Sequence, residues 1–264
     1  MQIFDQGYRK AMADDENATT LRDRRLNCRY VAHLDMLGMR GLALRDADLA
    51  WSTLQRLVEA RDEILSLPVQ LIDTNQIVSD RIRAFTFSDT IIVYSQSVEK
   101  ADISATIVLV SELFFRALYI GVPLRGGIAC GRFDVDLRRN LFAGPALVDA
   151  YQLGEESQWI GVSVDEEVHE AALAVPICAK GGAPAVIRWP MTTPTDGSTT
   201  SFVIDWVAPH RRNFNIPSIQ PHTFYKLGGF QDLFGPFEEL HERNRIKYEN
   251  TVAFINDRLL NTPQ

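Results

Sequence analysis

The order of apolar segments is the feature that most constrains how this chain can fold. Strand-like segments cover 28–36, 81–95 and 123–133, and the turn-forming residues Ser88, Asp89 and Thr90 split the second one. Apolar residues at helical spacing follow the first segment from about Asp46 and recur over 103–119. The order is therefore strand, helix, two strands, helix and strand. It predicts an α+β protein with a ferredoxin-like core, an antiparallel sheet packed against helices.

The length of 264 residues suits one large domain with additions to that core. We expect a polar N-terminal arm over 1–25, a core over 26–172, and a C-terminal part of the same domain over 173–264. The last part is expected to contain strands, a Thr/Gly/Pro-rich loop over 181–201 and a final amphipathic helix from Phe237 to Leu260.

Composition excludes several classes of protein. The net charge of −7 argues against a nucleic-acid-binding surface. The most apolar stretch, 103–124, is interrupted by Glu112 and Arg116, so we expect a buried helix and no membrane span. The N-terminus lacks the apolar segment of a secretory signal. The three cysteines show no close pairing and are expected to be reduced, which fits a cytoplasmic protein.

Two carboxylates occupy positions where strands end. Asp35 closes the first strand, and Asp89 lies in the turn of the following hairpin. These strands can be neighbours in a ferredoxin-like sheet, so the two acids can meet at one edge. Close carboxylates in an apolar surround repel each other, and a divalent cation removes that penalty. Oxygen ligands favour Mg²⁺ or Mn²⁺, the ions that accompany phosphate-bearing substrates.

The residues behind Asp35 fit the same chemistry. Leu37, Gly38, Met39 and Arg40 precede a helix start and offer backbone N–H groups to an anion. Gly38 would let the backbone approach a triphosphate closely. Two metal ions and a triphosphate suggest attack of an oxygen on the α-phosphorus, with pyrophosphate leaving. The simpler interpretation, in which each aspartate only makes a turn or a cap, stays open on spacing alone.

Other polar residues have weaker claims. His33 should share a face of the strand with Asp35, but a packed histidine is the simpler interpretation. Asp134 and Asp136 are more simply a solvated hairpin tip than a third metal site. One arginine among Arg40, Arg125, Arg138 and Arg139 could reach phosphate. The chain contains no G-x-S-x-G motif, P-loop or Cys/His cluster to support hydrolase, NTPase or zinc chemistry.

Four motifs in order resemble the catalytic domain of the class III nucleotide cyclases. They are "HLDMLGMRGL", "FSDTIIVYS", "LRGGIACGRF" and "FAGPALVDAYQLGEES", and the resemblance spans roughly 29–168. It implies that Asp35 and Asp89 bind two Mg²⁺ or Mn²⁺ ions, with the Met36 carbonyl as a further ligand. It also implies a homodimer with active sites at the interface, and we expect the segment "GPALVDAYQL" to belong to that interface.

The departures from that family concern the base. Adenylyl cyclases read adenine with a Lys and an Asp, and the resemblance places Phe85 and Leu141 at those positions. The transition-state Asn and Arg would correspond to Val148 and Gln152, of which only Gln152 can donate a hydrogen bond. Phe85 could stack on a base or belong to the core.

The chain is therefore most similar to the pyrimidine cyclases of bacterial anti-phage defence (Pycsar). That resemblance implies conversion of UTP to cyclic UMP, and a separate effector protein that responds to the product. A cytidylate cyclase acting on CTP, a purine cyclase, and an inactive nucleotide-sensing domain remain alternatives. The apolar segments 103–119 and 124–133 offer more apolar surface than a small sheet readily covers, which also suggests a homodimer.

Overall fold

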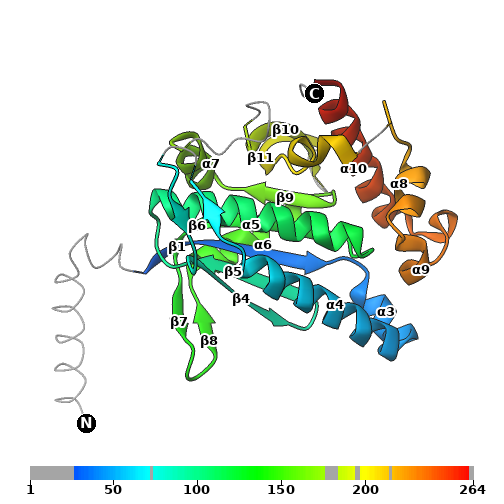
Figure 1. The fold of residues 1–264 in the computed structure, drawn as a ribbon. Helices are drawn as coiled ribbons and strands as arrows, with labels where there is room; N and C mark the ends of the chain where they lie inside the picture. Colours follow the sequence, from blue (N-terminus) through cyan, green and yellow to red (C-terminus); the bar gives the residue numbers. More distant parts are fainter. Residues whose placement is uncertain (1–26, 72–73, 176–183, 194–196, 214–215, 262–264) are drawn as a thin grey trace, which may run out of the picture.

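The computed structural model describes residues 27–71, 74–175, 184–193, 197–213 and 216–261. The predicted polar arm over 1–25 lies outside the described residues. A sheet of seven strands runs through the molecule in the order β10-β11-β9-β6-β1-β5-β4 (Figure 1). Its strands are β1 (Cys28–Met36), β4 (Ile82–Phe87), β5 (Thr90–Ser95), β6 (Leu124–Arg132), β9 (Gly161–Val164), β10 (Val186–Thr193) and β11 (Gly197–Ile204).

The remaining elements lie around this sheet. Two small ribbons are formed by β2 (Val69–Gln70) with β3 (Ile77–Val78), and by β7 (Asp134–Asp136) with β8 (Leu141–Ala143). The α-helices are α3 (Met39–Arg45), α4 (Ala47–Leu65), α5 (Lys100–Tyr119), α6 (Pro145–Glu156), α7 (Glu166–Leu173), α8 (Pro221–Leu227), α9 (Phe230–Phe234) and α10 (Glu242–Asn261). Two 3₁₀ turns cover Ala208–Asn213 and Phe237–Glu239.

The predicted ferredoxin-like core is present. β1 pairs antiparallel with both β5 and β6, and β4 pairs with β5, so the four core strands lie in the order β6-β1-β5-β4. Helices α3 and α4 connect β1 to β4, and α5 connects β5 to β6. This is the strand order and connectivity of a β-α-β-β-α-β unit. The α+β fold expected from the order of apolar segments is therefore confirmed.

Alternate residues of β1 serve two different layers. Tyr30, Ala32, Leu34 and Met36 join the main core with residues of α4 and α5. Val31 belongs to a second, smaller apolar cluster on the other face. On that face α6 packs closely on β6. The approach leaves no room for a side chain at Gly127, where a Cβ would lie 2.4 Å from the Ala150 carbonyl oxygen. The face of the sheet that carries Asp35 is thus covered by α6 near β6.

Two expectations for the C-terminal part are corrected. The predicted loop over 181–201 contains most of a hairpin, because β10 and β11 pair in register from Val186↔Ile204 to Thr193↔Gly197. Pro190 is compatible with a strand there, since β10 is an edge strand. The final helix begins at Glu242, because the extended backbone of Leu240 separates it from the turn at Phe237.

The apolar surfaces expected to require a partner are largely covered within the chain. Most of the apolar residues of α5 are buried, and Leu124, Ile128 and Ala129 of β6 are buried as well. The additional strands β9, β11 and β10 extend the sheet and enlarge the core around these elements. Among the described residues, no helix combines the length and the apolar character needed to cross a membrane.

Candidate active site at the end of β1

Asp35 and Asp89 lie side by side where β1 ends and β5 begins, as the sequence predicted. Asp35 is the penultimate residue of β1 and pairs with Thr90, the first residue of β5. The backbone N–H of Met36 donates a hydrogen bond of 2.9 Å to the carbonyl of Asp89. Ser88 adopts a left-handed conformation, with φ of 55°, and completes the tight turn between β4 and β5. The turn thus holds Asp89 beside the end of β1.

Arg125 and Glu155 extend this carboxylate pair into a larger charged group. Arg125 lies opposite Asp35 on β6, and its guanidinium is 3.4 Å from the Asp35 carboxylate. The same guanidinium donates to the carboxylate of Glu155 on α6. Arg125 is almost fully buried, whereas Asp35 is 29% exposed. Arg125 therefore orients two carboxylates while one of them still reaches the surface.

The charge balance favours a cation beside Asp35. Burial raises the pKa of the Asp35 carboxyl, Arg125 opposes that rise, and the negative charges of Asp89 and Glu155 add to it. A carboxylate whose ionised form is disfavoured in this way gains from a divalent cation. Carboxylate oxygens with a nearby backbone carbonyl form the hard donor set that suits Mg²⁺ or Mn²⁺. The residues present fit such an ion, although within the described ranges no three His, Cys, Asp or Glu residues cluster as a complete site.

The turn after β1 differs from the expectation in one respect. The Leu37 N–H donates 2.9 Å to the Pro123 carbonyl, so it is not available to an anion. Gly38 has φ of 82°, which a residue with a side chain rarely adopts, and no side chain caps the start of α3. Met39 is buried and Arg40 is exposed. Gly38, Met39 and Arg40 thus keep their predicted positions at the turn.

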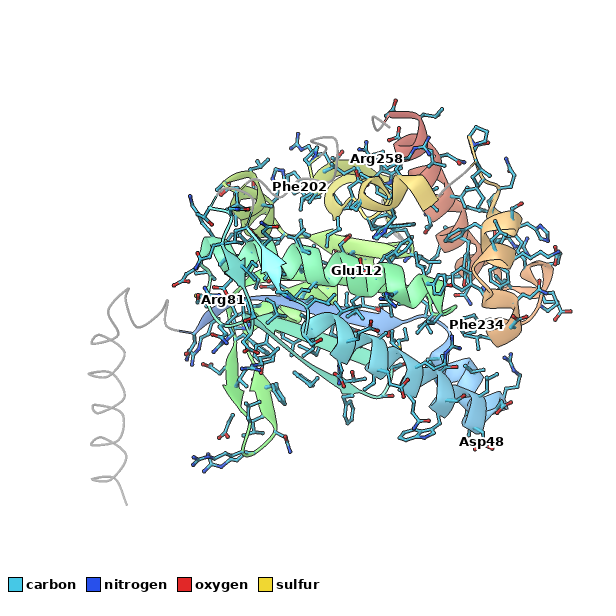
Figure 2. All side chains as sticks on the ribbon, viewed as in Figure 1. Asp48, Arg81, Glu112, Phe202, Phe234 and Arg258 are labelled. Atoms are coloured by element: carbon cyan, nitrogen blue, oxygen red, sulfur yellow. The ribbon has the colours of Figure 1, made fainter. Side chains whose placement is uncertain are left out.

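The C-terminal helices approach this turn closely. A Cβ at Gly38 would lie 2.8 Å from the ring of Phe234, which belongs to α9. Figure 2 marks Phe234 where α9 comes near the start of α3. The Arg45 guanidinium of α3 donates to the Leu233 carbonyl and ties the two helices together. A cavity of about 310 Å³ lies at this junction. It is lined by Leu37, Gly38, Gly41, Leu42, Arg45, Phe234, Leu240, Asn244, Lys247 and Tyr248.

Phe85 lies on the same face of the sheet as Asp35 but packs into the small apolar cluster. Its strand partner Ile92 pairs in turn with His33, two residues before Asp35. The Phe85 ring stacks on Phe142 of β8 with centroids 3.8 Å apart. Because one ring face is occupied by Phe142, only the rest of Phe85 can meet a base. His33 makes an edge contact with Tyr151 of α6, and burial lowers its pKa.

The other positions named from the sequence lie on exposed surfaces. Leu141 on β8 and Val148 on α6 are 59% and 53% exposed, and Gln152 is also exposed on α6. Figure 1 shows the β7–β8 hairpin projecting from the body of the molecule. At the end of this hairpin, the Asp136 carboxylate accepts hydrogen bonds from the backbone N–H groups of Arg138 and Arg139. The interpretation of Asp136 as a hairpin-tip residue is therefore confirmed.

Two residues near the acids have no counterpart among the predicted site residues. In the sequence, Glu155 belongs to the motif "AYQLGEES" without any signal of its own. Its contact with Arg125 depends on how α6 packs on the sheet. Lys247 on α10 is 94% buried, since its relative exposure is 6%. Lys247 is one of several charged residues along this helix, so the sequence did not distinguish it as a site residue.

Comparisons with known proteins found distant structural similarities and no sequence match. No protein-family model matches the sequence, and no curated protein matches it. One similar structure is the catalytic core of a rhodopsin-guanylyl cyclase with converted specificity, in complex with ATPαS. It is 12% identical with a TM-score of 0.48, over 68% of this chain and 95% of that chain.

A second similar structure is a class III adenylyl cyclase-like ATP-binding protein from Pseudomonas aeruginosa. It is 14% identical with a TM-score of 0.36, over 55% of this chain and 34% of that chain. Identities and TM-scores this low do not assign an activity. The function of this chain is therefore inferred from its own residues.

Proposed function

We propose that this protein is a pyrimidine nucleotide cyclase that converts UTP to 3′,5′-cyclic UMP and pyrophosphate. The observation that carries the proposal is the pairing of Asp35 and Asp89 at one sheet edge, fixed by the hydrogen bond from Met36 to Asp89. The glycine turn of Gly38 follows directly behind this pair. Two acids and an open backbone turn in this arrangement suit a metal-bound triphosphate.

Asp35, Asp89 and the Met36 carbonyl are the groups that would hold two Mg²⁺ or Mn²⁺ ions. When bound, such ions would neutralise the phosphates and polarise the reacting oxygens. Arg125 contributes by fixing the Asp35 carboxylate from the neighbouring strand. Glu155 holds Arg125 from the other side, so the guanidinium does not depend on Asp35 alone for a partner. The charged group is therefore organised before any ligand arrives.

In the proposed reaction the 3′-hydroxyl oxygen of the ribose bonds to the α-phosphorus. The bond between the α-phosphorus and the bridging oxygen to the β-phosphorus breaks, pyrophosphate leaves, and the hydroxyl proton passes to solvent. Gly38, Met39 and Arg40 would lie along the phosphates at the turn, and Gln152 would offer a hydrogen bond near the reacting phosphoryl group. No oxidant or reductant is required.

The preference for a pyrimidine rests on what is missing near the base. Phe85 is apolar and packed against Phe142, and Leu141 is apolar and exposed, so neither offers the polar contacts that a purine edge needs. Leaving a buried donor or acceptor unpaired costs about 1–3 kcal/mol. A cytidylate cyclase acting on CTP is the second candidate. The lack of polar contacts at Phe85 and Leu141 disfavours binding of a purine base more than binding of either pyrimidine base. We further propose that the product is a cytoplasmic second messenger in anti-phage defence, detected by a separate effector protein.

The protein is proposed to act as a homodimer across the face of the sheet that bears Asp35. Phe87 lies in the same register row as Asp35 and is 79% exposed. Val148 and Tyr151 of α6 are 53% and 48% exposed, and both belong to the predicted interface segment "GPALVDAYQL". Large apolar side chains gathered on one face are typical of an interaction surface. A second copy covering this face would border the acidic pair.

The deciding experiment is incubation of the purified protein with UTP, CTP, ATP and GTP at equal concentration and Mn²⁺, with products identified by mass spectrometry. Cyclic UMP as the main product supports the proposal, and mainly cyclic CMP supports the second candidate. Mainly cyclic AMP or cyclic GMP would restore the purine alternative. No cyclic product from any nucleotide would overturn the cyclase function and favour an inactive sensing domain.

A further inference from the structure

The cavity between α3 and α10 carries positive charge and no negative charge. Arg45 and Lys247 line it, together with Asn244 and the glycine turn at Gly38, and none of its lining residues is acidic. Its volume of about 310 Å³ is at the lower end of the range for small-molecule sites, roughly 300–1,000 Å³. The space and the charge therefore suit a compact anion better than a whole nucleotide.

Lys247 is the most unusual residue of this cavity. The residue is 94% buried, and its ammonium makes no hydrogen bond or ion pair among the described residues, yet its nitrogen is not one of the fully enclosed atoms that lack a partner. The ammonium therefore keeps access to the cavity that Lys247 lines. Burial, together with the nearby guanidinium groups of Arg125 and Arg243, lowers its pKa to about 8. A lysine held largely out of water gains from a charge partner, because a poorly solvated charge is costly. An anionic ligand in the cavity would supply the partner that this ammonium lacks among the described residues.

The position of Lys247 connects the cavity to the acidic pair. The carboxylates of Glu155 and Asp35 are near enough to oppose the fall in the Lys247 pKa. Asp35 closes β1, Gly38 follows it at the turn, and Gly38 lines the cavity. A chain of phosphates that begins at the metal-binding acids can thus continue past Gly38 toward Lys247.

We propose that this cavity seats the terminal phosphates of the nucleotide and that Lys247, from the C-terminal helix α10, is the residue that binds them. The proposal rests on the cyclase function proposed above. It assigns a role to the C-terminal helices, which lie against the turn after β1 and add Lys247 to the cation, Arg45, that α3 of the core supplies to the cavity.

The test uses inorganic tripolyphosphate as the probe, without divalent metal, and isothermal titration calorimetry of the full-length protein. We expect the unaltered protein to bind it and Lys247→Met to bind about 10–100-fold more weakly, because one charge-assisted contact is lost. Lys226→Met is the matched control, since Lys226 is an exposed lysine on α8. Binding should be unchanged in that variant. Absence of binding to the unaltered protein, or equal binding by Lys247→Met, would overturn the proposal.

A pH series separates a binding role from a structural one. The charged form of Lys247 is lost as the pH rises through about 8, so tripolyphosphate affinity should fall about tenfold or more between about pH 7 and about pH 9.5. Lys247→Arg keeps its charge throughout, and its affinity should change much less. Equal pH dependence in both proteins would contradict the assignment. The charged groups that influence Lys247 are Arg125, Arg243, Glu155 and Asp35, with Arg45 lining the same cavity.

Thermal unfolding gives an independent readout. Between about pH 8 and 10.5 the unfolded chain binds the Lys247 proton more strongly than the folded one, so the cost of this lysine is fully present below about pH 8 and is relieved as the pH rises. Lys247→Met should therefore raise the Tm at neutral pH by roughly 2–6 °C while weakening anion binding. A lower Tm together with weaker binding would mean that Lys247 is only structural.

The proposal and the cyclase function fail in different ways. Lys247-dependent binding of tripolyphosphate, with no cyclic product from any nucleotide, would leave the phosphate seat standing and remove the cyclase function. Cyclic nucleotide formation by Lys247→Met with an unchanged KM would remove the phosphate seat and leave the cyclase function standing.

Discussion

The ferredoxin-like core and the C-terminal helices meet at the end of β1 with opposite charges. The core supplies Asp35 and Asp89 at the edge of the sheet, with Glu155 held nearby by Arg125. The C-terminal helices supply Lys247 and place Phe234 against the Gly38 turn. The acidic side suits a metal ion, and the cationic side suits an anion. A metal-bound triphosphate is a ligand that uses both sides at once.

The two regions also differ in how they are stabilised. Asp35 is fixed by regular strand pairing on both sides, to Thr90 of β5 and to Arg125 of β6. Lys247 is carried on a single helix, which is anchored through the buried ion pair between Arg258 and Asp205. The acids therefore keep their positions whenever the sheet forms. The lysine keeps its position only when α10 is docked.

The largest expected effect comes from removing an acid. Asp35→Ala or Asp89→Ala should reduce cyclic nucleotide formation by about a thousandfold or more, because several kcal/mol of metal-assisted stabilisation is lost. The measurement is turnover with Mn²⁺, together with circular dichroism and sedimentation to verify a folded protein of unchanged assembly. Near-normal turnover in either variant would show that the assignment of two metal ligands is wrong.

Asp136→Ala is a suitable control for those variants. Asp136 is also a turn aspartate, but it lies on the β7–β8 hairpin, and its partners among the described residues are Arg138 and Arg139 of the same turn. If its loss reduced turnover as strongly as the loss of Asp35, the effect would reflect general damage to the fold. A small effect would assign the chemistry to the end of β1.

The contact between the two regions can be tested at Gly38. Gly38→Ala should destabilise the protein by about 1–3 kcal/mol, because φ of 82° strains a residue with a side chain and the new Cβ would lie 2.8 Å from the Phe234 ring. The Tm should fall accordingly. Adding Phe234→Leu should recover the part due to the ring and leave the part due to φ.

Gly41→Ala provides the matched comparison. Gly41 lies in α3, which begins directly after Gly38, and a Cβ at Gly41 meets no atom within 4 Å. Alanine favours a helix interior over glycine by about 0.5–1 kcal/mol, so this variant should be slightly more stable. If Gly38→Ala behaved like Gly41→Ala, the close approach of α9 to the turn would be contradicted.

The sequence made the core side of the site predictable because its signals are local. Asp35 ends an apolar strand, Asp89 lies in a short turn, and Gly38 precedes a helical pattern. The strand order then follows from the general connectivity of such units. Leu37 shows the limit of this reasoning, since its N–H is occupied by Pro123 from a different strand connection.

The C-terminal side could not be predicted in the same way. Lys247 lies on a charged helix whose pattern does not distinguish a solvated lysine from a buried one, and its burial depends on where α10 docks. The sequence predicted a loop over much of 186–204, because Thr, Pro and Gly residues there favour loops. In the structure, pairing between β10 and β11 overrides those local preferences. Long-range packing decided both cases.

The smallest expected effect concerns the base. Phe85 stacks on Phe142, and such a pair is worth about 0.5–1.5 kcal/mol beyond its buried area. Phe85→Tyr keeps the ring and should change turnover of UTP by no more than about threefold. Phe85→Lys should lose more, because it places a charge in an apolar cluster. The measurement is KM and kcat for UTP and CTP beside the Tm of each variant. A lower Tm with unchanged KM would confine Phe85 to the cluster, whereas a raised KM at unchanged Tm would place it against the pyrimidine.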